Sequence, residues 1–112
     1  MTNEELSVKL FEKAAKEQEE YRAKLLSMQP KQILENAYQY VVREDILISL
    51  EHDNFNDKRV RALLKSQHPI SDIYDIYIDL ETGGMNGIRD AIEETADKRI
   101  REAKAIENRD AR

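Results

Sequence analysis

The amino-acid sequence predicts a single all-α domain, and three observations lead to this fold class. Apolar residues recur at intervals of three and four along most of the chain, which is the spacing of one face of an α-helix. The chain has only three Gly and two Pro, so it offers few turns. Runs of alternating β-branched residues, which are typical of strands, are nearly absent. With 112 residues, we expect one domain over 1–112, a small bundle of about five helices.

The first helix is expected from about Asn3 to Leu26. Thr2 or Asn3 can cap its start, and two glutamates follow in the first turn, where the helix dipole favours negative charge. Its apolar stripe is narrow and consists of Leu6, Leu10, Ala14, Tyr21 and Leu25. A narrow stripe suits a helix on the domain surface or one that pairs with a second copy of itself. We favour packing within the same chain.

The helix expected over residues 31–51 is the most apolar segment and is predicted to be the buried centre of the bundle. Pro30 fits the first turn of this helix and separates it from the first one. One apolar row consists of Leu34, Tyr38, Val41 and Ile48, and a second of Ile33, Ala37, Tyr40 and Leu47. A helix that is apolar over so much of its circumference needs neighbours on several sides. We therefore expect the other helices to surround it.

Three charged residues, Arg43, Glu44 and Asp45, interrupt the apolar rows of this central helix. Charges that become buried need partners. They can form an ion-pair network that fixes the register of neighbouring helices, or they can belong to a polar functional site. The sequence favours the network, because no second cluster of polar residues completes a site.

Three further helices are expected after the central one. A short helix over about 57–66 is capped by Asn56 or Asp57, and Phe55 before it folds back on the core. The next covers 71–81, with Ser71 as its cap, and Gly83 and Gly84 end it. The last helix is expected to begin near Met85 or Asn86. Asp97 and Arg101, one turn apart, are expected to form an ion pair on its solvent-exposed face. Residues 107–112 are expected to fray, because they have no large apolar side chains to bury.

Several classes of protein are excluded or disfavoured by composition. The absence of cysteine excludes disulfides and thiolate metal sites. No apolar run approaches the roughly 20 residues that a membrane span needs, and the acidic N-terminus is unlike a signal peptide. We therefore expect a cytoplasmic protein without membrane contact. His52 and His68 belong to no metal-binding pattern and are expected at the surface, so we predict no catalytic residue, metal or cofactor.

The net charge of −5 is unevenly distributed, since residues 66–97 carry eight acidic side chains and one basic one. Within this segment Asp72, Asp75 and Asp79 recur at helical spacing, and Glu81 follows. Such a row is either a solvated face or a surface that contacts a protein partner with a basic groove. Phosphates would repel it, which argues against direct nucleic-acid binding through this helix.

Carboxylate pairs support one enzymatic alternative. Glu17 with Glu20, and Glu94 with Asp97, are spaced like the magnesium-binding carboxylates of all-α nucleotide pyrophosphohydrolases. Charged helices contain such pairs by chance, and these two lie at opposite ends of the chain. We therefore favour a protein without enzymatic activity.

Four stretches carry a resemblance to a known family. They are EKAAKEQEEYRAKLLSMQP (residues 12–30), ILENAYQYVVREDILISLEHDN (33–54), RALLKSQHPISDIY (61–74) and MNGIRDAIEETAD (85–97). In their order and spacing the chain resembles a family of small bacterial proteins of unknown function, carried frequently on conjugative and other mobile elements. The resemblance covers roughly residues 8–97 and is most specific over Glu17–Arg22 and Tyr40–Leu47. The family supplies no catalytic residues.

The resemblance implies a function that the residues alone do not. Small acidic proteins from such elements include inhibitors of the nuclease Cas9, and this chain is similar to these anti-CRISPR proteins. We therefore expect a non-enzymatic inhibitor that binds a basic groove of Cas9 or of its guide-RNA complex through Asp72, Asp75, Asp79 and Glu81. The alternatives are a structural or regulatory accessory protein of the mobile element that acts as a homodimer, and a metal-dependent nucleotide phosphohydrolase. The oligomeric state is expected to be a monomer or a homodimer.

Overall fold

The chain is helical through nearly all of the part that the computed structural model describes, which is residues 1–80 and 84–110. The helices are α1 (Asn3–Leu26), α2 (Pro30–Glu35), α3 (Ala37–His52), α4 (Asp57–Leu64), α5 (Pro69–Asp79) and α6 (Gly84–Asp110). No strand occurs in these residues. The predicted all-α fold class is therefore confirmed.

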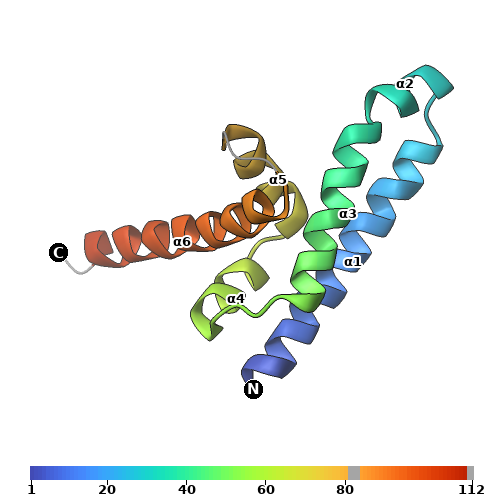
Figure 1. Cartoon of the computed structure of the whole chain (residues 1–112). Helices are drawn as coiled ribbons and strands as arrows, with labels where there is room; N and C mark the ends of the chain where they lie inside the picture. The colour runs from blue at the N-terminus through green and yellow to red at the C-terminus, as the bar shows by residue number, and fades with distance from the viewer. Residues whose placement is uncertain (81–83, 111–112) are drawn as a thin grey trace.

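The helices are arranged as a long hairpin crossed by a second group. α1 and α3 lie side by side, with α2 at the turn that joins them, and α6 leads away from this pair (Figure 1). α4 and α5 fill the space between α6 and the hairpin, since each packs against both α1 and α6. The resulting molecule is elongated, measuring 53 × 28 × 26 Å, and both the outer part of α6 and the α2 end of the hairpin project from it (Figure 1).

The prediction for α1 is confirmed in its bounds and its packing. Thr2 is the N-cap, and its side chain accepts a hydrogen bond from the backbone of Glu5 while Glu5 reaches back to the backbone of Thr2. This reciprocal arrangement satisfies two free backbone donors of the first turn. The predicted stripe faces the core of the same chain, where Leu6, Leu10, Ala14 and Leu25 are buried. Tyr21 is half-buried.

The expectation of one buried central helix over 31–51 is wrong in two respects. The helix is interrupted at Asn36, whose side chain donates to the carbonyl of Gln32, so that α2 and α3 are separate. A polar side chain that bonds to nearby backbone competes with the regular helix in this way. In addition, α3 has neighbours on one side only, because α1, α5 and α6 all pack against the face that contains Val42, Ile46 and Leu50.

One of the two predicted apolar rows consequently remains at the surface. Its four members, Leu34, Tyr38, Val41 and Ile48, are exposed. Of the second row, Leu47 packs partly buried against the core, Ile33 and Tyr40 are partly buried, and Ala37 is exposed. Apolar periodicity shows which residues share a face, but it does not show whether the same chain has a helix left to cover that face. Here α2 is too short and lies at the end of the hairpin.

The core is completed by α4, α5 and α6. α4 begins as predicted, since Asn56 caps it by accepting from the backbone N–H of Arg59, and Phe55 before it is buried. α5 is a helix, but it begins at Pro69, before the predicted Ser71 cap, and ends at Asp79. Of the two glycines predicted to end it, Gly83 lies outside the described residues. Gly84 is the first residue of α6.

α6 supplies a large part of the core and then leaves it. Its buried residues are Ile88, Ala91, Ile92, Thr95 and Ala96, whereas the side chains of 101–109 are exposed. The helix continues to Asp110, and the fraying of residues 107–112 stays a prediction, with 111 and 112 outside the described part of the chain. None of the described helices is long and apolar enough to cross a membrane.

Candidate functional site

A buried polar junction holds α1, α3 and α5 together. The side chain of Arg43 in α3 is only 3% exposed, and each of its three guanidinium nitrogens has a partner. Nε donates to Gln18 (3.0 Å), Nη1 to the hydroxyl of Ser71 (3.0 Å) and Nη2 to Glu17 (3.4 Å). The Arg43 carbon Cζ also lies 4.1 Å from the ring centre of Tyr21. An arginine in this setting is fully paired and positions the residues around it.

Glu17 extends the junction to the start of α5. Its carboxylate accepts from the backbone N–H groups of Ile70 (2.8 Å) and Ser71 (2.9 Å) and from the Ser71 hydroxyl (2.9 Å). α5 has no side-chain cap of its own at His68. A carboxylate from α1 therefore takes the role of the N-cap, at the end of the helix dipole that favours negative charge.

The junction decides between the two interpretations of the charged residues of α3. Arg43 belongs to the network described above, and Glu44 accepts from the Gln18 amide at 3.1 Å. Among the described residues, no buried side-chain nitrogen or oxygen lacks a hydrogen-bond partner. The prediction of an interhelical network is confirmed for Arg43 and Glu44. Asp45 takes no part in it and lies partly exposed on the outer side of α3.

Tyr21 contributes packing and stacking to the junction. Burial raises the pKa of its hydroxyl, and the nearby charge of Arg43 acts in the opposite direction. A phenol whose pKa lies above its ordinary value near 10 stays protonated at neutral pH. Tyr21 is therefore a neutral partner for the guanidinium and does not serve as a base.

The predicted acidic row on α5 is divided by the structure. Asp72 accepts a hydrogen bond from the Ser66 hydroxyl and lies 3.9 Å from Nη1 of Arg99 in α6. Asp75 and Asp79 are exposed, and Glu81 lies outside the described residues. Asp72 therefore already contacts a hydroxyl and lies near a cation of the same chain, and its contact with a partner, like that of Glu81, stays a prediction.

Asp75 also has cationic side chains nearby. It lines a hollow of about 220 Å³ between α5 and α6, together with Lys98 and Arg99. Positive charge at this hollow offsets part of the negative charge of α5, which the sequence alone did not reveal. Of the predicted row, Asp75 and Asp79 are the exposed members among the described residues.

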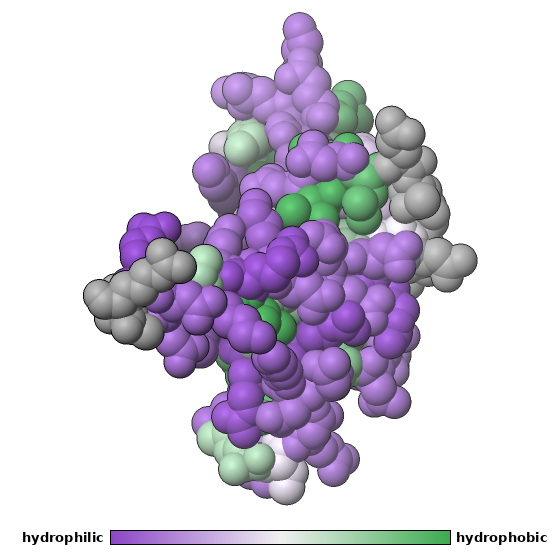
Figure 2. Space-filling model, turned by 90° about the vertical axis from the view of Figure 1, so that its left-hand side faces the viewer, coloured by the Kyte–Doolittle hydropathy of each residue, from purple (hydrophilic) through white to green (hydrophobic). Residues whose placement is uncertain are grey.

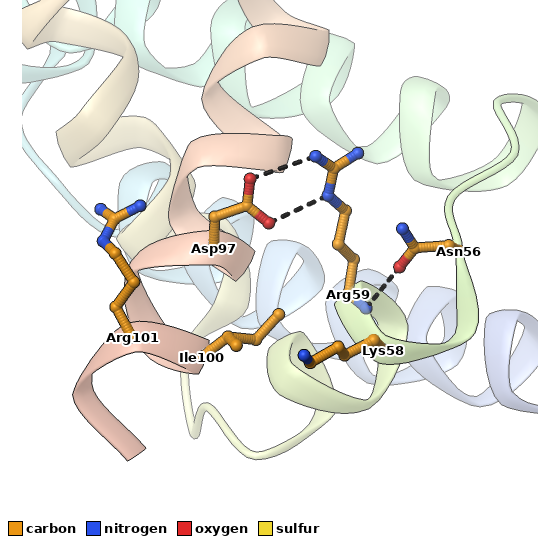
Figure 3. Close-up of a pocket in the computed structure, with 6 residues that line it drawn as sticks. All are labelled: Asn56, Lys58, Arg59, Asp97, Ile100 and Arg101. Carbon is orange, nitrogen blue, oxygen red and sulfur yellow. Dashed lines mark hydrogen bonds and ion pairs between the residues drawn. The ribbon is translucent and has the colours of Figure 1, made fainter. Parts of the chain in front are cut away.

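A second set of ion pairs joins α4 to α6. Arg59 donates to both carboxylate oxygens of Asp97, from Nε at 3.0 Å and from Nη2 at 3.1 Å, as Figure 3 shows. Its third nitrogen donates to Glu93. The hydrogen bond from Arg59 lowers the pKa of Asp97. The predicted Asp97–Arg101 ion pair is wrong, because Asp97 faces Arg59 and Arg101 donates to Glu94 at 2.8 Å.

Three of the four carboxylates of the phosphohydrolase alternative are thus engaged within the chain, and the fourth, Glu20, is exposed. Glu17 binds Arg43 and the start of α5, Asp97 binds Arg59, and Glu94 binds Arg101. Within residues 1–80 and 84–110, no group of three or more His, Asp or Glu residues is arranged to hold a metal ion. Binding a metal at these positions would require the existing pairs to break.

Both histidines lie at the surface, as predicted. His52 is at the end of α3 with its imidazole 3.5 Å from Glu51, and His68 precedes α5.

A groove between α4 and the outer part of α6 was missed by sequence reasoning. It has a volume of about 490 Å³. Its floor is apolar and consists of Ala62, Ile100, Ala103 and Ile106. The charged residues that line it are the cations Lys58, Arg61, Lys65, Arg99 and Lys104 and the acids Glu102 and Glu107. The basic face of α4 was visible in the sequence. The groove exists only because α6 passes alongside α4. The spacing of apolar residues along each helix does not indicate which helices lie next to each other.

Apolar surface is also scattered over the end of the molecule from which α6 projects. Figure 2 shows this side, where small hydrophobic areas are separated by hydrophilic side chains.

Comparison with known proteins identifies the family. A family model described as "Protein of unknown function (DUF3848)" matches residues 6–100, which is most of the chain. The chain belongs to the DUF3848 family. The DUF3848 match includes the polar junction, the acidic surface of α5 and the Arg59–Asp97 pair. No curated protein and no solved structure matches the chain.

Proposed function

We propose that this DUF3848 protein is a non-enzymatic protein-binding module that places the acidic end of α5 in a basic groove of its partner. The observation that carries the proposal is the pair of exposed carboxylates, Asp75 and Asp79, one turn apart on α5. Ile78 lies between them and is 55% exposed. One helical turn separates the two carboxylates by about 6 Å along the axis, a spacing that overlaps that of nucleic-acid phosphates.

The position of α5 supports this role. Glu17 and Arg43 hold the first turn of α5 through the buried junction. A binding surface on a helix that is already fixed loses little conformational freedom on association, so more of the contact energy appears as affinity. Opposite charges on the two proteins would speed their encounter and make binding weaken as salt rises.

The specific form of the proposal is inhibition of a Cas9-type nuclease, and it rests on the resemblance described above. Such nucleases hold a guide–target heteroduplex in a positively charged channel. An acidic protein that occupies this channel would exclude the nucleic acid. Purified protein is mixed with Cas9 and guide RNA, and cleavage of a target DNA is measured. We expect inhibition that declines as salt is added. Full cleavage at a large molar excess, across several Cas9 orthologues, would eliminate the nuclease form.

A charge-reversal pair tests the surface itself. Asp75→Lys/Asp79→Lys is expected to weaken partner binding at least tenfold. The matched control is Glu12→Lys/Glu19→Lys, which changes the net charge by the same amount at two exposed positions of α1. Circular dichroism verifies that both variants fold. Equal loss in both variants would show a general effect of net charge, and unchanged affinity in both would reject the α5 surface.

A partner other than Cas9 is sought with the same two variants. Wild type, the α5 variant and the α1 control are used as baits in one bacterial lysate, and bound proteins are quantified by mass spectrometry. A partner of the proposed kind is recovered by the wild type and the control and lost with the α5 variant. If every protein bound by the wild type is bound equally by the α5 variant, the proposal fails in its general form.

A further inference from the structure

The exposed side of α3 forms a ridge of apolar and acidic side chains. The α3 ridge consists of Tyr38, Val41, Asp45, Ile48 and Glu51, which lie on one side of the helix by their spacing. Its three apolar members are 65%, 55% and 45% exposed, respectively. Large exposed apolar side chains that gather on one face of a helix are characteristic of surfaces that contact another molecule. The described part of the chain supplies no helix that covers the α3 ridge.

The α4/α6 groove has the complementary character. Its floor of alanine and isoleucine side chains is apolar, and Ile106 at its outer end is 57% exposed. Lysines line its rim, where the ridge would present carboxylates. Cations outnumber the acids Glu102 and Glu107 around the apolar floor, so the groove fits a helix with exposed apolar and acidic side chains better than a nucleic acid, which would leave the floor uncovered.

We propose that the α3 ridge of one copy of this chain binds in the α4/α6 groove of a second copy. Val41 and Ile48 would cover the apolar floor, while Asp45 and Glu51 would meet Lys58 and Lys104 on the rim. The contact cannot form within one chain, because α6 packs against the opposite, buried face of α3.

The proposed contact joins two different surfaces and is therefore head-to-tail. Each copy retains a free ridge at one end and a free groove at the other, so assembly can continue beyond a dimer. This inference does not involve Asp75 or Asp79 and is independent of the function proposed above. It also explains why a row with the periodicity of a buried face lies at the surface of the isolated chain.

Two charge-reversal variants each remove one half of the contact. Asp45→Lys/Glu51→Lys changes the ridge, and Lys58→Glu/Lys104→Glu changes the groove. Lys9→Glu/Lys16→Glu is the matched control, since both lysines are exposed on α1. Mass is measured by light scattering and sedimentation equilibrium from about 10 μM to about 1 mM, the range of weak association. Circular dichroism compares the helix content of all variants.

We expect the mass of wild type and control to rise with concentration above that of the 13.1 kDa chain. Each contact variant alone should remain monomeric. An equimolar mixture of the two contact variants should associate again, because the unchanged ridge of one variant meets the unchanged groove of the other, and the two reversed surfaces also carry opposite charges. Ile106→Glu offers a second groove variant should the double substitution fail to fold, and it should also be monomeric.

Three results would overturn the proposal. Wild type that stays at 13.1 kDa over the whole range would show that no self-association occurs and leave the ridge to a different protein. Association of the contact variants as strong as that of wild type would place the interface elsewhere. Monomers in the mixture would show that ridge and groove do not bind each other.

Discussion

Arg43 is the residue on which the relative positions of three helices most depend. It lies in α3 and bonds to Gln18 and Glu17 in α1 and to Ser71 in α5, with no guanidinium nitrogen left over. Pairing offsets the desolvation cost of a buried charge, and removing one member of the pair leaves the other charge buried without compensation. The junction therefore favours one arrangement of these helices over alternatives in which they slide past one another.

Removing Arg43 tests this role. Arg43→Ala leaves Glu17 as a buried carboxylate without its cation, and we expect the free energy of unfolding to fall by about 3–5 kcal/mol. Urea denaturation followed by circular dichroism gives the value. Arg22→Ala, at an exposed arginine of α1, is the control and should change stability by less than about 0.5 kcal/mol. Similar losses in both variants would contradict the special role of Arg43.

Asp97 makes stability depend on pH. Its hydrogen bond with Arg59 places the pKa of Asp97 below the ordinary 3.8 in the folded protein. As the pH falls, the Asp97 carboxylate is protonated in the unfolded chain at a higher pH than in the folded protein. The stabilisation by its hydrogen bond with Arg59 is therefore fully present above about pH 4, and it is lost as the pH falls through the pKa that Asp97 has in the folded protein. Unfolding free energies at pH 7 and pH 2.5 should therefore show wild type approaching Asp97→Asn at the lower pH. A constant difference between them would be evidence against this linkage.

At the scale of helices, α5 is the element whose start is supplied from elsewhere in the chain. Its first backbone donors bond to Glu17, which is more than fifty residues away in sequence. The sequence placed the start at Ser71 because serine is a common N-cap, and it had no means of detecting a carboxylate from another helix. Local capping rules describe α1 and α4 well, where Thr2 and Asn56 act within one turn.

Glu17→Gln should loosen the beginning of α5 selectively. The amide keeps the size of the side chain but removes the charge and one acceptor, and losing a cap costs about 1 kcal/mol. Amide hydrogen exchange over residues 70–73 should become about fivefold faster, with α4 unchanged. Glu19→Gln, at an exposed position of α1, should leave both helices unchanged. Faster exchange throughout the protein would indicate global destabilisation instead.

For the whole molecule, the sequence was sufficient for the fold class and for most helices. The apolar stripe and the capping residues placed α1 with its bounds, and the predicted packing of Phe55 on the core is confirmed. The arrangement of helices around α3 was not predictable in this way. A row such as Tyr38 and Val41 has the same spacing whether a neighbouring helix covers it or not, and that depends on where α6 passes.

The acidic surface illustrates the same limit. Asp72, Asp75 and Asp79 are equivalent in the sequence, but only Asp72 meets both a hydroxyl and an arginine from other parts of the chain. The network around Arg43 was predicted as a type of interaction, since charges inside an apolar segment need partners. Its partners Gln18 and Ser71 were not, because neither residue carries a signal of burial.

Two neighbouring isoleucines of α3 test where the core ends. Ile46 is fully buried in the cluster formed by α1, α3, α4, α5 and α6, whereas Ile48 is 45% exposed on the ridge. Ile46→Asp places an unpaired carboxylate in this cluster, at a cost that a domain of marginal stability cannot absorb, so we expect an unfolded protein at 25 °C. Ile48→Asp should retain the wild-type circular dichroism spectrum with a change of less than about 1 kcal/mol. If Ile48→Asp also unfolded the isolated chain, α3 would have to be covered on both sides, as the periodicity alone had predicted.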